Sequence, residues 1–427
     1  MSTIAFHTLG CKVNQYDTEA MRESFERAGW TAVDFDADAD VYLINTCTVT
    51  GTGDQKSKKL IRRVAREHPS CAIIVAGCLA QREAEALLQM DNVALVIGVQ
   101  RRAEVVELLE RARREGPVNA VAPLKGASFE HLFVTRHEGK TRATMKIQEG
   151  CDRYCAYCII PSVRGPVRSM PLEDVRAEAR RLAEAGYPEI VVTGIHLASY
   201  GRGTGDTLLG AIRAVAESVP RVRLGSLEPV AVTDEFARGV AELGRVMPQF
   251  HLSMQSGSAG VLSRMRRRYT PEEYMRAVER LRKYLPGCAI TTDVLTGFPG
   301  ETDEEAQETL DFVRAVGFAR IHVFPYSRRK GTAADAMPNQ VPEAVKHERA
   351  AKLLALGNQL EENYVSTLVG TVQDVLFETA AGEAEAEGYT GQYVRVRAKA
   401  QPGQLCRVRI LAREGTLARG EVVIDGR

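Results

Sequence analysis

The sequence predicts a three-part α/β protein whose first two parts contain parallel strands and whose last part is a small all-β barrel. Short apolar runs alternate with helical patterns from residue 3 to about 110, and the alternation returns from 143 to about 330. After about residue 363 the pattern becomes all-strand. We place the three units at 1–113, 143–335 and 364–427, with a connector at 114–142 and a linker helix at 336–363.

The N-terminal unit is expected to be a parallel sheet with helices on both faces. Four apolar runs precede four helical patterns, as strand–helix alternation requires. In such a sheet, ligands bind beyond the carboxyl ends of the strands. The expected strands are 4–8, 41–45, 72–76 and 94–97, and the expected helices are 17–28, 54–67, 82–89 and 103–113.

Three cysteines follow three of these strands directly. Cys11, Cys47 and Cys78 each lie just past a strand, so three separate loops bring one thiol each to the same edge of the sheet. Chance could place one cysteine at this edge, but three cysteines there indicate a common site. Cys71, Cys288 and Cys406 lie within strand-like runs and are expected to be ordinary buried cysteines.

A second set of cysteines, Cys151, Cys155 and Cys158, is spaced C-x3-C-x2-C after the apolar run at 144–148. Thiolates are soft ligands that suit iron–sulfur clusters, zinc or copper(I). A four-iron cluster has four ligand positions, so three cysteines would leave one iron open. Zinc needs a fourth ligand, and no Cys or His lies within 30 residues downstream. A disulfide is disfavoured because three is odd and nothing else suggests secretion.

The amino-acid composition limits the classes of protein to which this chain can belong. Apolar residues make up 44% and charged residues 26%, as in an ordinary globular protein, and the net charge is +1, so any nucleic-acid site must be a local patch. No apolar run approaches the ~18 residues of a membrane span, and Met1 to Gly10 lacks the features of a signal peptide. Nine cysteines then favour metal binding in a reducing cytoplasm over disulfides.

The run Cys151-Asp-Arg-Tyr-Cys155-Ala-Tyr157-Cys158 resembles the signature of the radical S-adenosylmethionine (SAM) family. In that family the amino and carboxylate groups of SAM chelate the open iron, and reductive cleavage of SAM gives a 5′-deoxyadenosyl radical. The resemblance implies an open six-stranded (β/α)6 partial barrel, and strands near 189–193, 222–226, 250–254, 288–295 and 320–325 would complete the six. It also implies SAM contacts at Tyr157, Gly194, Gln255, Asp293 and Phe324, with Thr292 a further candidate.

The N-terminal cysteines narrow the resemblance. Leu9-Gly-Cys11-Lys-Val-Asn14-Gln-Tyr-Asp17-Thr18, Asn45-Thr-Cys47 and Ala76-Gly-Cys78 are similar to the first domain of the methylthiotransferases, which carry a second four-iron cluster on three such cysteines. Asn14, Asp17 and Thr18 also match that family's motif. Spacing alone predicts that Asp17 and Thr18 cap the helix that follows them.

The last unit carries alternating cations. In Val394-Arg395-Val396-Arg397-Ala398-Lys399 the cations share one face of the expected strand. Arg407 and Arg409 alternate with apolar residues in the same way. This pattern indicates either a barrel face that follows a phosphate backbone or a solubilising surface. Position, length and the stretch Gly388-Tyr-Thr-Gly-Gln-Tyr393 resemble the RNA-binding TRAM module. Two other basic runs, Arg264-Met-Arg-Arg-Arg268 and Arg328-Arg-Lys330, fit a solvated helix face and an RNA-facing rim equally well.

Together the resemblances imply a tRNA methylthiotransferase that uses two [4Fe-4S] clusters and SAM. Its expected substrate is carbon 2 of N6-threonylcarbamoyladenosine 37 in the tRNA anticodon stem-loop, because the Cys11 stretch and Gly225-Ser-Leu-Glu-Pro229 are similar to that subfamily. Such an enzyme needs a sulfur source and an electron donor such as flavodoxin or ferredoxin. The alternatives are isopentenyladenosine 37, an aspartate of a ribosomal protein, or a non-catalytic iron–sulfur RNA-binding protein.

Overall fold

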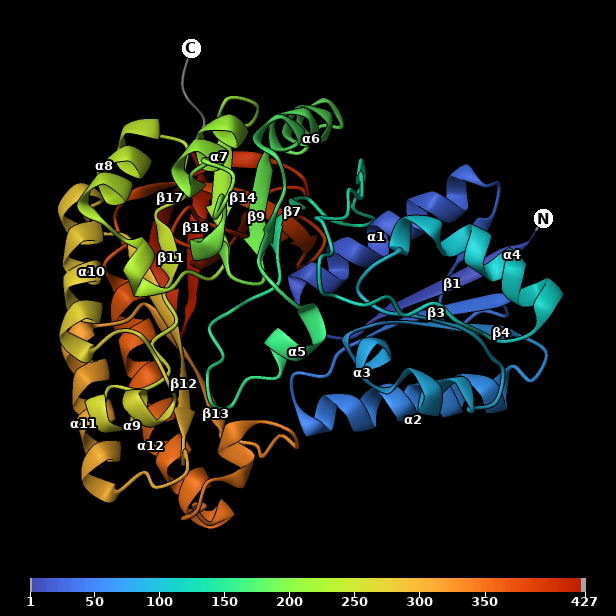
Figure 1. Cartoon of the computed structure of the whole chain (residues 1–427). Coiled ribbons are helices and arrows are strands. Elements are labelled where there is room, and N and C mark those ends of the chain that lie inside the picture. The colour runs from blue at the N-terminus through green and yellow to red at the C-terminus, as the bar shows by residue number, and fades with distance from the viewer. Residues whose placement is uncertain (1, 424–427) are drawn as a thin grey trace.

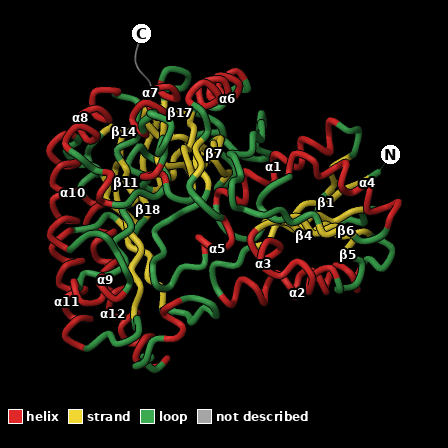
Figure 2. Tube along the Cα trace, viewed as in Figure 1, coloured by secondary structure: helices red, strands yellow, loops and turns green. Residues whose placement is uncertain are grey.

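The computed structural model describes residues 2–423 and contains two α/β lobes and a small β-barrel (Figure 1). The N-terminal lobe lies beside the larger central lobe, and the short helix α5 (Ile160–Arg164) lies between them. Strands in Figure 2 form one sheet inside the N-terminal lobe and a curved set inside the central lobe. The fold class expected from the sequence is confirmed. No helix of the described residues is long and apolar enough to cross a membrane.

The N-terminal lobe is a six-stranded parallel sheet in the order β2-β1-β3-β4-β5-β6. Helices α1 and α4 cover one face and α2 and α3 the other (Figure 1), which explains why its strands are almost continuously apolar. Two edge strands were not expected from the sequence, and one of them lies in the expected connector. In chain order the strands are β1 Thr3–Thr8, β2 Thr31–Val33, β3 Val41–Thr46, β4 Ala72–Gly77, β5 Val93–Ile97 and β6 Val118–Asn119. The helices are α1 Lys12–Arg27, α2 Gly51–Glu67, α3 Cys78–Leu88 and α4 Val105–Glu115.

The central lobe contains the six expected parallel strands. They form two hydrogen-bonded groups, β10-β9-β7 and β11-β12-β13, which single parallel bridges between Val222 and Val246 and between Leu227 and Leu252 connect. A short antiparallel strand, β8 (Arg168–Ser169), pairs with β7, and among the described residues no pairing joins it to β13. The barrel is therefore open on one side. The six strands are β7 Ala143–Glu149, β9 Glu189–Gly194, β10 Arg221–Leu224, β11 Gln249–His251, β12 Ala289–Thr296 and β13 Arg320–Pro325.

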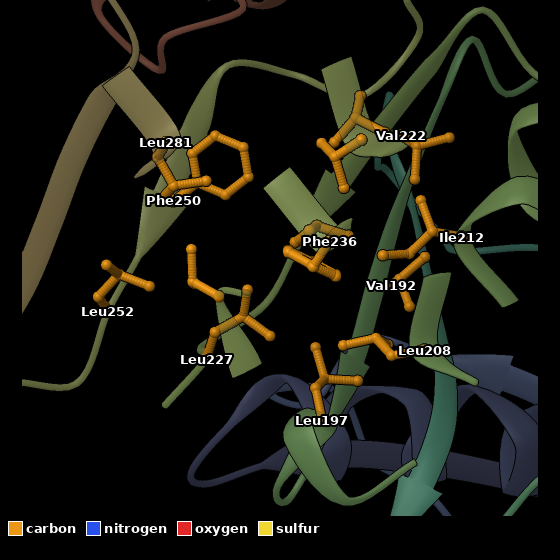
Figure 3. Packing of buried hydrophobic residues seen from close by; sticks show 14 of the residues in the cluster. Val192, Leu197, Leu208, Ile212, Val222, Leu227, Phe236, Phe250, Leu252 and Leu281 are labelled. Atoms are coloured by element: carbon orange, nitrogen blue, oxygen red, sulfur yellow. The ribbon is translucent and has the colours of Figure 1, made fainter. Parts of the chain in front are cut away.

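Helices pack on the outer face of these strands and form the main hydrophobic core. Figure 3 shows Phe236 of α8 between two groups of this core: Val192, Val222 and Ile212 on one side, and Leu227, Phe250 and Leu252 on the other. Two helices begin with capping boxes, Thr270 with Glu273 and Thr302 with Glu305, which fix where each starts. The helices after α5 are α6 Leu172–Glu184, α7 Leu208–Ala216, α8 Asp234–Leu243, α9 Ala259–Arg264, α10 Pro271–Tyr284 and α11 Asp303–Val316.

The long helix α12 (Glu343–Ser366) leads into a closed five-stranded barrel in the order β14-β15-β16-β18-β17. Its core contains Val396, Ala398, Val408 and Ile410, so the predicted alternation of inward apolar and outward charged residues is confirmed. Closure leaves no unpaired strand edge. In chain order the strands are β14 Val372–Ala380, β15 Glu385–Tyr389, β16 Arg395–Lys399, β17 Leu405–Glu414 and β18 Leu417–Val422.

One buried carboxyl group connects the two lobes. Glu178 of α6 lies 3.2 Å from the Tyr16 hydroxyl of α1, and that hydroxyl also contacts the Leu132 carbonyl oxygen. Burial raises the pKa of Glu178 to about 8 from its ordinary value of 4.5. At neutral pH the folded protein therefore keeps this carboxyl protonated, whereas the unfolded chain ionises it.

We therefore expect Glu178 to make the free energy of unfolding fall as pH rises from about 5 to about 8, by up to about 1.4 kcal/mol per pH unit. The folded state holds a proton in this window that the unfolded state has lost. Glu178→Gln keeps the shape without the titration, so its urea-unfolding free energy should fall less steeply over the same window. Glu184→Gln, an exposed change on the same helix, is the control. A Glu178→Gln profile parallel to that of the wild type would refute the assignment.

Candidate active site

The loop that carries Cys151, Cys155 and Cys158 follows β7 directly. Gly150 adopts φ +74°, and a Cβ there would fall 1.9 Å from the Pro166 carbonyl oxygen, so only glycine fits. The Cys151 amide donates to the Gly165 carbonyl oxygen at 3.1 Å, and the Cys158 amide to that of Cys155 at 2.9 Å. All three cysteines line one cavity of about 630 Å³ inside the open barrel.

These thiols suit a metal cluster. Burial raises the pKa of Cys151 to about 11 and that of Cys158 to about 12, so they would stay protonated at neutral pH without a cation to bind. Among residues 2–423 no three His, Cys, Asp or Glu side chains converge as ligands of one ion.

The N-terminal cysteines, Cys11, Cys47 and Cys78, lie where the sequence predicted. Strands β1, β3 and β4 are parallel neighbours, so the loops after them meet at one edge of the sheet. Cys11 precedes α1 and lines the central cavity, and Cys78 begins α3. Gly10 adopts φ +110°, and a Cβ there would lie 2.8 Å from the Cβ of Cys47. Cys11 of this set therefore opens on the same space as Cys151, Cys155 and Cys158, whereas Cys47 and Cys78 do not line that cavity.

Arg164 connects the two sets. Its Nε donates to the Cys78 sulfur at 3.1 Å, and its Nη1 donates to Glu149 at 2.9 Å, two residues before Cys151. Ile159 and Val163 cover Cys78 from the same segment. The guanidinium is fully buried, so it holds the two cysteine loops at a fixed separation.

Asp17 is the centre of a buried network of charges. It forms ion pairs with Arg102, with Lys146 at 2.5 Å and with Arg164 at 3.3 Å. Burial alone would raise the pKa of Asp17, but these cations outweigh it and hold the pKa below its usual range. The prediction that Asp17 and Thr18 cap a helix was wrong. Helix α1 starts at Lys12, so both residues lie inside it, and the Thr18 hydroxyl donates to the Asn14 carbonyl oxygen at 3.0 Å.

Each basic run contains one arginine that turns away from solvent, whereas Arg266, Arg268, Arg328 and Lys330 are exposed, as both expected roles require. Arg267 points inward, with Nη1 3.3 Å from the Cys155 sulfur and Nη2 3.4 Å from Glu228. Arg329 crosses to the N-terminal lobe, where it pairs with Asp54 at 2.6 Å. Glu228 also pairs with Arg153 at 2.9 Å and with His196 at 3.0 Å, a group that the sequence reading missed. Local charge density revealed the arginines but not their distant partners.

The proposed SAM contacts divide into three groups. Tyr157, Gly194, Gln255 and Asp293 line the central cavity. Phe324 lies on the same face of β13 as His322 of the cavity wall, but it is exposed and does not itself line the cavity. Thr292 faces away: its hydroxyl donates to the Leu252 carbonyl oxygen at 2.5 Å and accepts from the Met254 amide at 2.9 Å, so its role is structural.

The cationic face of the C-terminal barrel is less positive than the sequence suggested. Arg395, Lys399, Arg407 and Arg409 are exposed, but Glu387 of the neighbouring strand pairs with Arg397 and lies 3.7 Å from Arg395. The run 395–419 contains a single Glu, and strand pairing brings in acidic residues from β15.

Two family models match the chain. Residues 3–98 match "Uncharacterized protein family UPF0004" and residues 145–313 match the Radical SAM superfamily. Over 406 residues the chain is 44% identical to the Bacillus subtilis threonylcarbamoyladenosine tRNA methylthiotransferase MtaB. The aligned region covers 93% of this chain and 90% of that protein. The chain belongs to the methylthiotransferase family.

Other methylthiotransferases and one solved structure extend the comparison. The Thermotoga maritima MtaB is 36% identical over 399 residues, covering 92% of this chain and 91% of that one. The Acidothermus cellulolyticus tRNA-2-methylthio-N(6)-dimethylallyladenosine synthase is 38% identical over 398 residues, covering 90% and 79%. The radical SAM methyltransferase TsrM from Kitasatospora setae superposes with a TM-score of 0.58 at 16% identity, covering 78% and 74%, and shows the fold alone.

We expect Asp17→Ala to lower the free energy of unfolding by about 3–5 kcal/mol, because it leaves buried cations without their carboxylate. Urea unfolding of the purified protein measures this. Glu26→Ala on the same helix breaks only a surface pair with Arg136 and should cost about 1 kcal/mol or less. Equal losses for the two variants would show that the network does not hold the lobes together.

Proposed function

We propose that this methylthiotransferase inserts a methylthio group at carbon 2 of N6-threonylcarbamoyladenosine 37 in tRNA. The observation that supports this most directly is that Cys11 of the N-terminal set lines the same cavity as Cys151, Cys155 and Cys158. Carbon 2 carries a C–H bond with no acidic proton, so acid–base groups cannot break it, and sulfur must be delivered to the same atom. A radical source and a sulfur site must therefore face one bound base.

The two sets of cysteines fit the two clusters that the family implies. Cys151, Cys155 and Cys158 would hold the cluster that binds SAM, and Cys11, Cys47 and Cys78 the second cluster. With these groups bound, the site has radical chemistry to remove hydrogen and a source of sulfur. The surrounding side chains position them: Arg267 donates to Cys155, Arg164 donates to Cys78, and Tyr157, Gly194, Gln255 and Asp293 form the wall where SAM would lie.

The substrate assignment follows the relatives. Proteins named as threonylcarbamoyladenosine enzymes match this chain at 32–44% identity over most of its length. The Acidothermus relative makes isopentenyl-type adenosine the second candidate. In either case turnover requires electrons and sulfur, so an electron donor such as flavodoxin or ferredoxin and a sulfur donor are expected partners.

Nucleoside mass spectrometry of tRNA tests the function. Cells that lack this protein should accumulate threonylcarbamoyladenosine and lose its 2-methylthio form, and the wild-type gene should restore it. Cys47→Ala should fail to restore it, whereas Cys71→Ala, at a buried cysteine outside both sets, should succeed. Purified Cys151/Cys155/Cys158→Ala protein should hold about four irons instead of about eight and release no 5′-deoxyadenosine. Unchanged 2-methylthio nucleosides in the deletion strain would refute the proposal.

The exposed cations of the C-terminal barrel are proposed to contact tRNA phosphates. Changing Arg395, Arg397 and Lys399 to Gln should weaken tRNA binding and flatten its log–log salt dependence by about 0.7–0.9 per lost contact. Because Glu387 already neutralises part of this face, Glu387→Gln should strengthen binding instead. The inward residues are untouched, so stability should change little. If filter binding at several salt concentrations shows unchanged slopes, the face is only a solvated surface.

A further inference from the structure

Lys12 is the charged residue that the cysteine chemistry leaves unexplained. It follows Cys11 at the start of α1 and lines two cavities: the central one, and a smaller one of about 350 Å³ between α1, the connector and the C-terminal barrel. Tyr393 of the C-terminal barrel lines both as well, so the two spaces adjoin. Cavities of this size are typical of sites for small organic groups.

The charges around Lys12 do not balance. Glu189 accepts from both Arg221 and Arg223 at 2.7 Å, and Glu378 pairs with Arg142 at 2.7 Å. In the smaller cavity the other carboxylate, Glu19, lies 3.5 Å from Arg22. Within residues 2–423, Lys12 has neither a hydrogen-bond nor an ion-pair partner for its ammonium group. Lys140 adds a further cation to the lining, so this pocket suits an anion.

We propose that Lys12 binds the carboxylate of the threonylcarbamoyl group on the substrate base, an inference that rests on the proposed function. In that substituent a carbonyl group links the nitrogen of threonine to N6 of adenosine, so the threonine end keeps a free carboxylate and a hydroxyl. The ammonium of Lys12 pairs with the carboxylate, and Lys140 adds positive charge from the smaller cavity. Lys12 is a specificity-determining residue in this assignment.

The surroundings favour a group carried on the base over a backbone phosphate. The subsite adjoins the barrel interior, whose walls include Gln249, Thr291 and Arg320 from the first halves of their strands. Tyr393 closes it and is held rigidly: its ring stacks on Tyr389 at 4.5 Å. A flipped base and its substituent can enter such a space, while the phosphates remain outside.

The same cation discriminates against an apolar substituent. Lys12 is exposed to the water of these cavities, so an isopentenyl group seated against it would displace part of that water and leave the ammonium without a partner, which costs free energy. A site that pairs with a polar group rejects the analogue that lacks it much more strongly than an apolar pocket rejects a slightly different shape.

Equilibrium binding to anticodon stem-loops tests the assignment. The probes carry threonylcarbamoyladenosine, unmodified adenosine or isopentenyladenosine at position 37, and the protein is reconstituted anaerobically to equal iron content. Lys12→Met should weaken binding of the threonylcarbamoyl probe about ten- to a hundred-fold and leave the unmodified probe unchanged. Lys12→Arg should retain most of the preference. Lys59→Met, at an exposed lysine that lines neither cavity, should retain all of it.

A second measurement needs no variant and so is independent of cluster loading next to Cys11. The wild-type protein is titrated with a threonylcarbamoyl probe whose carboxylate is masked as the methyl ester, and its affinity should fall by the same factor. Equal affinity for ester and acid would overturn the inference, as would equal losses for all probes with Lys12→Met, the result expected of a phosphate contact. If the tRNA analysis still shows 2-methylthio product in either case, only this inference fails and the proposed function stands.

Discussion

The buried ion network around Asp17 is the constraint on which the arrangement of the molecule depends. It takes Asp17 from α1, Arg102 from the turn before α4, Lys146 and Glu149 from β7, and Arg164 from α5. Buried charges are expensive unless each has its partner, so such a network adds little net stability. The network instead requires one particular position of the two lobes relative to each other. Any other position would leave carboxylates or guanidinium groups buried and unpaired.

That position matters because the network ends at both sets of cysteines. Glu149 lies two residues before Cys151, and Arg164, which pairs with Glu149, donates to the Cys78 sulfur. A chemistry that needs hydrogen abstraction and sulfur transfer at one carbon tolerates little variation in the distance between its two sources. Rigid ionic contacts at the junction meet this need better than a flexible linker would. The connector also packs on α1 through Leu132 and Val134, which removes further freedom.

The sequence predicted what depends on neighbours along the chain. Strand ends, the cysteines that follow them and the alternation in β16 are local patterns, and each was found as expected. Asp17, Arg267 and Arg329 were misread because their partners lie far away in the sequence: Lys146 for Asp17, Cys155 for Arg267, Asp54 for Arg329. A polar residue near a helix start predicts a cap equally well whether its partner is a backbone amide or a distant cation. Composition likewise could not reveal that β15 places Glu387 beside the cations of β16.

A second ionic junction fixes the C-terminal barrel at the other end of the central cavity. Arg223 donates to the carbonyl oxygens of Thr390 at 3.3 Å and Gly391 at 3.0 Å while also pairing with Glu189, and Arg142 joins Glu189 to Glu378. These contacts hold the turn that carries Tyr393 against the strand ends. The unit proposed to grip tRNA thus forms part of the wall around the substrate base. On these two proposals RNA docking and recognition of the modified base would be coupled through a rigid contact, because a shift of the barrel on the RNA would also move the wall of the pocket.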